Sequence, residues 1–276
     1  MTFLKTLPYK IAWFFAPEAF AKKALRHLSN PLLVKPRPFE EEVMKTAKVS
    51  TRAFKNFTIA QYRWGFGPKK ALLMHGWEGR ATNFAALIPL LVDRGYTVIG
   101  FDAPSHGNST KAATSFFDYS ELTTEYLNEG PYDLFVSHSF GSVPLSLALS
   151  QKPNYPVNRM FVVTSPDRFE DRVIQVIRMM GLPLRAKERL LDHFETATQL
   201  PVRELGVAHY CKHLKPVRAA VLHGSIDNVL PQEWSKRVAD SIQNSEFYVI
   251  EGTGHYRILW HPETQKRLIE LIDTAP

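Results

Sequence analysis

The 276-residue sequence predicts an α/β protein with a mostly parallel central sheet, helices on both faces and a small helical cap. Strand-like apolar segments alternate with amphipathic helical segments from about residue 70 onward. This alternation lapses over residues 166–215, which have only helical patterns, and then returns. The composition, 45% hydrophobic and 22% charged, is that of a globular domain with a sizeable core.

The alternation defines most elements of the predicted fold. Predicted strands are residues 49–54, 57–64, 70–76, 96–103, 132–139, 157–165, 218–224 and 246–252. Predicted helices are residues 83–95, 116–130, 140–150 and 231–242, several within 166–215, and one from residue 262. In the first helix, Phe84, Leu87, Ile88 and Leu91 fall on one face, and Gly95 provides the C-terminal stop.

Three parts of the chain follow from this order. We expect a basic N-terminal arm at residues 1–48 and a core formed by 49–165 and 216–276. Residues 166–215 are then a helical cap inserted into the core, lying over the sheet. The Pro36-Arg37-Pro38 segment reads as a linker within the arm.

The net charge of +7 is concentrated near the N-terminus. Residues 1–39 contain seven Lys or Arg residues and one acid, Glu18, so they carry +6 of that charge. The rest of the chain is almost neutral, which argues against a nucleic-acid partner. The segment is also rich in aromatic and aliphatic residues, which suits peripheral membrane contact through 1–39. The alternative, which we favour, is an arm that packs its apolar side on the domain.

The single cysteine, Cys211, excludes an internal disulfide and needs no oxidising compartment. The apolar stretch at residues 11–16 is short and followed by Pro17 and Glu18, which is a poor signal peptide. The uncharged run at 134–151 contains serines, a histidine and a proline, so a buried strand, turn and helix explain it better than a membrane span. We therefore expect a cytoplasmic location, with membrane association through the arm left open.

The stretch "LFVSHSFGSVPLSLALS" places Ser139 at a sharp corner between a strand and a helix. A turn this tight pushes the central side chain outward and needs small residues two positions before and after it. Ser137 and Gly141 meet that need, although the usual G-x-S-x-G pattern has glycine at the first position. The alternative is a buried turn serine that caps the next helix.

A serine nucleophile needs a base, and the base needs an acid to orient it. Asp227 in "VLHGSIDNVLP" and His255 in "VIEGTGHYRIL" each follow a predicted strand, so both should reach the sheet edge that carries Ser139. We predict Ser139, Asp227 and His255 as the catalytic residues.

The other histidines fit the role of base less well. His223 lies within a strand, and His138 should point away across the turn. His106 should tie a loop by hydrogen bonds, and His261 precedes a helix. The remaining candidates lie in the predicted cap, at His193, His209 and His213.

Acyl transfer also needs hydrogen-bond donors for the oxyanion. The backbone N–H of Phe140, directly after the predicted nucleophile, is one candidate. The second should come from the loop after strand 70–76, where "HGWEG" makes the N–H of Trp77 the candidate. Trp77 and Phe140 are therefore the predicted oxyanion hole.

Four motifs in order, covering about residues 50–275, resemble those of α/β-hydrolase-fold serine hydrolases of the esterase and lipase type. They are "HGWEG", "FDAPSHGNS", "SHSFG", and "HGSIDNVLP" paired with "GTGH". The resemblance implies Ser139, Asp227 and His255 as triad, Trp77 and Phe140 as oxyanion hole, and 166–215 as cap. Ser137 and the long arm depart from the family pattern. The serine at the corner argues against the branches that use aspartate there, the haloalkane dehalogenases and epoxide hydrolases.

The expected activity is hydrolysis of small to medium carboxylic esters, with a small-molecule acyl substrate as the partner. Acyl transfer, thioester or peptide cleavage and carbon–carbon bond hydrolysis by the same triad stay open, as does ligand binding without catalysis. We expect no metal or organic cofactor, since no Cys/His cluster or phosphate loop is present in the sequence. The oligomeric state is not predicted.

Overall fold

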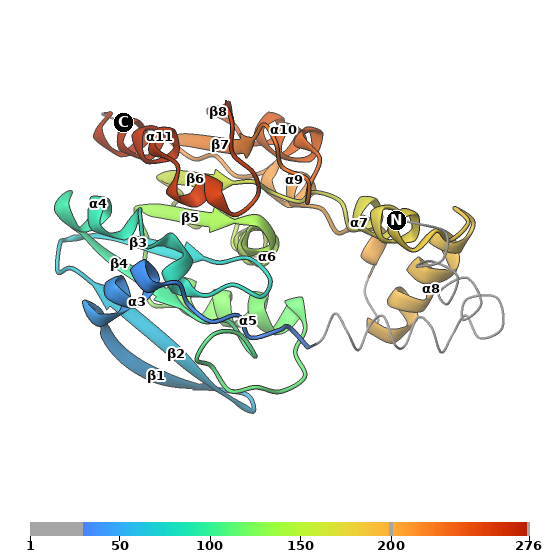
Figure 1. Ribbon diagram of the computed structural model, residues 1–276, viewed down its shortest axis with the longest axis horizontal. Coiled ribbons are helices and arrows are strands. Elements are labelled where there is room, and N and C mark those ends of the chain that lie inside the picture. The colour runs from blue at the N-terminus through green and yellow to red at the C-terminus, as the bar shows by residue number, and fades with distance from the viewer. Residues whose placement is uncertain (1–29, 199–200, 275–276) are drawn as a thin grey trace.

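The computed structural model describes residues 30–198 and 201–274, which form a single eight-stranded sheet flanked by helices (Figure 1). Its strands are β1 (Lys48–Phe54), β2 (Phe57–Trp64), β3 (Lys69–Met74), β4 (Tyr96–Phe101), β5 (Leu134–His138), β6 (Arg159–Val163), β7 (Arg218–Gly224) and β8 (Ser245–Ile250). The strand order is β1-β2-β4-β3-β5-β6-β7-β8. Only the β1–β2 and β2–β4 pairs are antiparallel, which confirms the predicted fold class.

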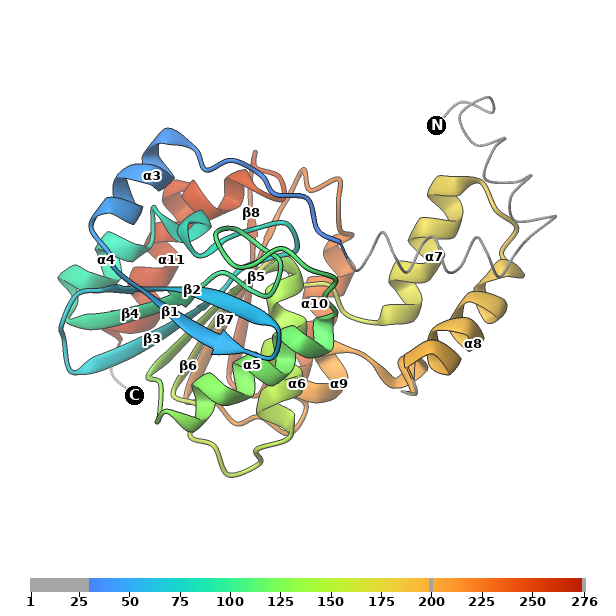
Figure 2. The same cartoon turned by 90° about the horizontal axis from the view of Figure 1, so that it is seen from below.

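Helices cover both faces of the sheet (Figure 2). The described helices of four or more residues are α3 (Pro38–Lys45), η1 (Ala81–Phe84), α4 (Ile88–Asp93), α5 (Phe116–Asn128), α6 (Ser142–Ser150), α7 (Phe169–Met180), α8 (Ala186–Thr198), α9 (Val207–Cys211), α10 (Gln232–Ser241), η4 (Arg257–Trp260) and α11 (Pro262–Asp273). Helices α5, α6, α9 and α10 bury apolar side chains on one face of the sheet. On the other face, η1, α4, η4 and α11 do the same.

The helix predicted for residues 83–95 is shorter in the structure. A 3₁₀ turn, η1, comes first, and the α-helix α4 begins only at Ile88. Pro89 explains this boundary, because proline is accepted in the first turn of an α-helix but not in its interior. The stripe of Phe84, Leu87, Ile88 and Leu91 is nevertheless buried against the sheet.

Helices α7 and α8 and the short turn η3 (Val202–Glu204) project from the sheet and share their own apolar cluster, which we call the helical lobe (Figure 2). Val173, Ile177, Leu191 and Phe194 are buried in it. Helix α9 also falls within residues 166–215, yet it packs against α6 and α10 on the sheet. The segment predicted as a cap thus contains both the lobe and a piece of the core.

Of the predicted arm, residues 30–48 are described. Residues 1–29, and with them most of the predicted membrane contact, lie outside the described residues. Leu32 donates its backbone N–H to Glu78 Oε1 at 3.1 Å, and the Arg80 guanidinium contacts the Val34 carbonyl. These contacts hold the start of the described chain against the loop after β3. Within the described residues, no helix has the length and apolarity needed to span a bilayer.

Candidate active site

The corner after β5 forces Ser139 into a left-handed conformation, with φ of +51°. The 3₁₀ turn η2 (Ser139–Gly141) follows at once and leads into α6. At Gly141 a Cβ atom would lie 2.2 Å from the carbonyl oxygen of Met74 in β3, so no larger residue fits without moving the backbone. A strained serine held by such close packing is typical of functional sites.

Ser137 occupies the position where the usual pattern has glycine. Its side chain is fully buried, and its Oγ lies 3.1 Å from Ser142 Oγ in the first turn of α6. The hydroxyl pair satisfies both polar groups across the corner. Ser137 therefore adds a hydrogen bond between β5 and α6, which a glycine at this position could not form.

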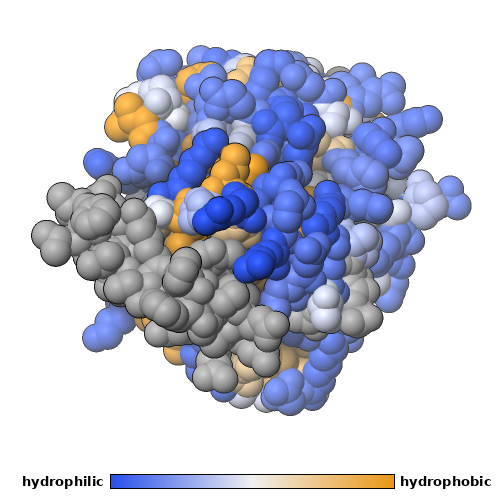
Figure 3. All heavy atoms as spheres, turned by 90° about the vertical axis from the view of Figure 1, so that its right-hand side faces the viewer, coloured by the Kyte–Doolittle hydropathy of each residue, from blue (hydrophilic) through white to orange (hydrophobic). Residues whose placement is uncertain are grey.

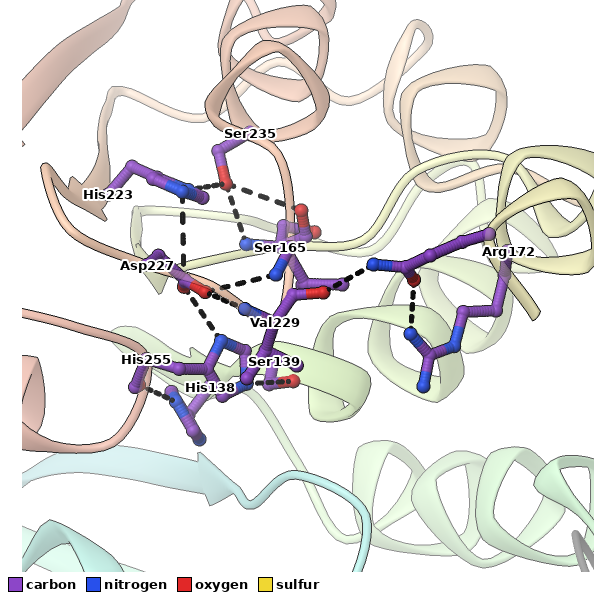
Figure 4. A network of polar contacts seen from close by, with 11 residues as sticks. His138, Ser139, Ser165, Arg172, His223, Asp227, Val229, Ser235 and His255 are labelled. Atoms are coloured by element: carbon purple, nitrogen blue, oxygen red, sulfur yellow. Dashed lines mark hydrogen bonds and ion pairs between the residues drawn. The ribbon is translucent and has the colours of Figure 1, made fainter. Parts of the chain in front are cut away.

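The structure brings the three predicted catalytic side chains together from separate loops (Figure 4). His255 Nε2 lies 2.9 Å from Ser139 Oγ, and His255 Nδ1 lies 2.8 Å from Asp227 Oδ2. An ionised carboxylate only accepts hydrogen bonds, so Nδ1 carries the imidazole proton and Nε2 is free to accept one from the serine hydroxyl. This arrangement can take a proton from Ser139 and hold the resulting imidazolium.

Asp227 is held ready as an anion. Its other oxygen, Oδ1, accepts backbone N–H bonds from Val229 at 2.7 Å and from Leu230 at 3.0 Å. Burial raises the pKa of Asp227, but the hydrogen bond and charge of His255 and these two N–H groups outweigh it. The net pKa of Asp227 is lowered.

His138 contacts the loop that carries His255, a role that the sequence did not indicate. Its ring is fully buried, and Nε2–H donates to the His255 carbonyl oxygen at 2.9 Å. Burial and the nearby His255 ring lower the pKa of His138 to about 3, so this imidazole is neutral. The predicted orientation of His138, away across the turn, does not include this contact, which braces the backbone of His255.

A second buried histidine faces Asp227 from β7. His223 Nε2 lies 3.9 Å from Asp227 Oδ2, and His223 Nδ1 lies 2.8 Å from Ser235 Oγ. Ser235 in turn accepts the N–H of Ser165 at 2.9 Å, at the end of β6. Figure 4 shows His223 and Ser235 above Asp227 in this view, whereas His255 lies below it.

Trp77 and Phe140, the two predicted oxyanion donors, both line the cavity at Ser139. Their rings meet edge to face with centroids 5.2 Å apart. Within residues 30–198 and 201–274, neither backbone N–H donates to another protein group. Both are therefore available for a ligand oxygen.

Within the "FDAPSHGNS" loop, the buried side chain of Asp102 holds the loop in place by hydrogen bonds. Its carboxylate accepts from Ala81 N at 2.8 Å, Asn108 N at 2.8 Å and Tyr62 Oη at 3.0 Å. As predicted, His106 is a loop tie, with Nδ1 2.9 Å from the Pro104 carbonyl oxygen.

A cavity of about 540 Å³ opens over Ser139, within the size range of small-molecule sites. Its apolar lining includes Phe116, Val143, Leu230 and Leu259. Arg168 and Arg172 from the lobe side and Lys35 from the N-terminal segment add positive charge. Among the described residues, no group of three or more His, Cys, Asp or Glu side chains could hold a metal ion.

Comparison with known sequences agrees with this architecture. The model of the alpha/beta hydrolase family matches residues 71–271. A similar protein is the uncharacterised hydrolase YugF of Bacillus subtilis (strain 168), 24% identical over 235 residues, which cover 68% of this chain and 84% of YugF.

Solved structures share the fold at low sequence identity. The esterase EaEST from Exiguobacterium antarcticum has a TM-score of 0.62 at 16% identity, covering 81% of this chain and 98% of EaEST. A membrane phospholipase A, described as a bacterial virulence factor, has a TM-score of 0.64 at 15% identity, covering 97% of this chain and 95% of that chain. At these identities the likeness concerns the fold alone.

Proposed function

The chain belongs to the alpha/beta hydrolase family, and from this premise we propose that it is a serine hydrolase that cleaves carboxylic esters. The observation that carries the proposal is the pair of contacts at His255, 2.9 Å to Ser139 Oγ and 2.8 Å to Asp227 Oδ2. Ser139, Asp227 and His255 are the proposed catalytic residues.

In the proposed mechanism, Ser139 Oγ attacks the acyl carbon while His255 Nε2 takes its proton. Negative charge on the former carbonyl oxygen is stabilised by the N–H groups of Trp77 and Phe140, each donor contributing about 3 kcal/mol. His255 then gives the proton to the leaving alcohol, which leaves an acyl group on Ser139. A water molecule, deprotonated by His255, attacks this ester and restores the serine.

The apolar lining of the cavity supports an acyl group of small to medium size. The same relay would also serve thioester, peptide or carbon–carbon cleavage, acyl transfer, or a pocket that only binds. A panel of p-nitrophenyl esters, acyl thioesters, peptides and an acyl-acceptor alcohol separates these reactions. Esters are expected to be the fastest substrates.

Covalent labelling tests the nucleophile directly. A fluorophosphonate probe is expected to label the wild-type protein and to leave Ser139→Ala unlabelled, because only an activated serine reacts at a useful rate. Ser146→Ala is a matched control, since this serine is buried on α6 and its hydroxyl donates to the Val143 carbonyl of the same helix at 3.0 Å. Equal labelling of the wild type and Ser139→Ala would end the proposal.

For location, we propose a cytoplasmic protein; contact of residues 1–39 with anionic membranes is the alternative to packing of this arm on the domain, and vesicle binding decides between them. Co-sedimentation with vesicles of phosphatidylserine and phosphatidylcholine is expected to fall as salt rises, because screening weakens attraction between basic residues and anionic lipid. Absence from the vesicle pellet even at low salt would dismiss the membrane contact.

A further inference from the structure

The cavity over Ser139 has an uneven distribution of charge. Trp77, Phe140 and Val143 make its lining near the serine apolar, whereas Arg168 and Arg172 line it on the side of the lobe. Figure 3, which faces the α7 and α8 side of the molecule, shows strongly hydrophilic groups directly beside apolar ones. The whole lining contains five basic residues, Lys35, Arg37, Arg80, Arg168 and Arg172, and three acids, Glu40, Glu78 and Asp167. An apolar interior with this excess of cations suits a ligand that has an acyl part and an anionic part.

The two arginines lie at the start of α7. Arg168 is the N-cap of α7, and the N–H of Arg172 bonds to the Arg168 carbonyl at 3.3 Å. Both residues line the cavity over Ser139, so their positive charges add on this side of it. An anion in the cavity would be attracted by both charges and could accept charge-assisted hydrogen bonds from them.

The carboxylate next to Arg168 is engaged elsewhere. Asp167 Oδ2 lies 2.7 Å from Arg237 Nε but 3.9 Å from Arg168 Nε. Its Oδ1 accepts the backbone N–H of Ala208 at 3.0 Å. Arg168 is exposed, so this long contact leaves most of its hydrogen-bonding capacity unused.

The acids in the first turn of α7 do not neutralise the pair either. Glu170 pairs with Lys187 at 2.6 Å, and Asp171 pairs with Arg237. The Arg172 guanidinium contacts the neutral Gln175 amide, and no carboxylate of residues 30–198 and 201–274 forms an ion pair with it. Positive charge therefore exceeds negative charge on this wall of the cavity.

We propose that Arg168 and Arg172 form an anion-binding subsite, so that the favoured substrates are acyl esters or thioesters bearing a carboxylate or phosphate group. Guanidinium groups bind both anions through paired, charge-assisted hydrogen bonds. The subsite rests on the proposed function for its role in substrate choice, but its binding of anions is measurable without turnover.

Isothermal titration calorimetry on the full-length Ser139→Ala protein measures that binding. Monomethyl adipate, which carries a free carboxylate, is compared with dimethyl adipate, its neutral counterpart, and butyryl-coenzyme A tests a phosphate source. The carboxylate ester or the thioester is expected to bind about tenfold more tightly than dimethyl adipate at low salt, an advantage that shrinks as salt rises. Tightest binding by dimethyl adipate would overturn the proposal.

Arg168→Gln combined with Arg172→Gln removes both charges. The variant is expected to lose the preference for the anionic ligand and to keep its affinity for dimethyl adipate. Arg178→Gln is the matched control, because Arg178 is exposed on the same helix and does not line the cavity. An anion preference that survives in the double variant, or disappears equally in Arg178→Gln, would contradict the subsite.

A third variant separates charge from positioning. Gln175 Nε2 donates to the Val229 carbonyl at 2.7 Å, so Arg172 also touches the Asp227 loop indirectly. Gln175→Leu breaks this link and keeps both guanidinium groups, and its anion preference is expected to match that of the parent protein. If Gln175→Leu loses the preference as well, the arginines act by positioning and the subsite fails.

Failure of the proposed function gives a different pattern. If the protein is not labelled by the fluorophosphonate but binds monomethyl adipate through Arg168 and Arg172, the anion-binding subsite stands and the esterase proposal fails. If the protein is labelled at Ser139 but binds the neutral and the anionic ligand equally, the esterase proposal stands and the subsite fails.

Discussion

The sheet edge that carries Ser139 and the helical lobe beside it are stabilised in different ways. At the sheet edge, the side chains of Asp227 and His223 are inaccessible to solvent, and short hydrogen bonds to backbone or buried groups fix them. In the lobe, a small apolar cluster is supplemented by exposed ion pairs, such as that of Arg203 with Asp192 at 2.6 Å.

We infer from this difference that the sheet edge carries out the chemical step and that the lobe influences which ligands bind. Buried hydrogen bonds hold a proton relay within the few tenths of an ångström that proton transfer requires. Exposed ion pairs contribute little to stability and are screened by salt, so the lobe is held less firmly. Changes at the sheet edge should therefore remove activity, whereas changes in the lobe should mainly alter which ligands bind.

The largest expected effect comes from Asp227→Asn at the sheet edge. An amide cannot hold His255 in the required tautomer, and kcat for a p-nitrophenyl ester is expected to fall by about 10⁴. Asp240→Asn is the control, because Asp240 lies on the exposed side of α10, where it pairs with Lys236. A fall of less than about tenfold would mean that Asp227 does not orient the base.

A pair of glycine substitutions compares backbone packing in the two regions. Gly141→Ala is expected to lower the free energy of unfolding by about 3 kcal/mol or more, because its Cβ would lie 2.2 Å from the Met74 carbonyl oxygen. At Gly206, next to the lobe, the nearest atom would be 3.5 Å away, so Gly206→Ala should change stability by less than about 1 kcal/mol. Urea denaturation measures both, and similar losses would erase the distinction.

Acid should destabilise the protein through His75 behind the site. His75 Nε2 accepts the N–H of Ala103 at 2.9 Å, a bond that the protonated ring cannot make. Burial lowers the pKa of His75 from 6.5 to about 4. The unfolded chain therefore binds this proton first as pH falls, and stability declines between about pH 6.5 and 4, by about 1.4 kcal/mol per pH unit.

Urea unfolding at several pH values in that window checks this slope. In His75→Gln, the dependence of stability on pH is expected to be weaker by the contribution of one histidine. His138, His106 and His223 are also buried with lowered pKa values, so they contribute to the slope that remains in the variant. An unchanged slope in the variant would show that His75 is not the group that titrates.

The smallest expected effect is in the lobe. Arg203 contacts Glu188, Asp192 and Glu195, all near the surface. Because exposed ion pairs are screened, Arg203→Gln should lower the melting temperature slightly at low salt and not at all at high salt. A loss of stability as large as that of Gly141→Ala would mean that the lobe is as tightly held as the sheet edge.

The sequence was sufficient for features set by local pattern. Periodicity predicts the order of strands and helices along the chain. Residues next to the strand ends predict the corner at Ser139 and the loops that carry Asp227 and His255. Parallel strands end at one edge of a sheet, and this rule alone predicts that the three side chains should lie close together.

Contacts between distant segments could not be predicted where they do not follow from the ends of parallel strands. The bond from His138 to the His255 carbonyl joins residues 117 positions apart, and no pattern near either histidine signals it. Likewise, α9 has the same helical character as α7 and α8, but whether it packs on the lobe or on α6 depends on the tertiary fold. Arg168 and Arg172 read as solvent-exposed charges until the cavity is known.

The central claim is that His255 activates Ser139 to form an acyl-enzyme. Rapid acid quenching during turnover of p-nitrophenyl butyrate, followed by peptide mapping by mass spectrometry, tests it most directly. We expect a butyryl group on the peptide that contains Ser139, and no such group in His255→Gln. A butyryl group on another residue, or equal acylation of Ser139 without His255, would contradict it.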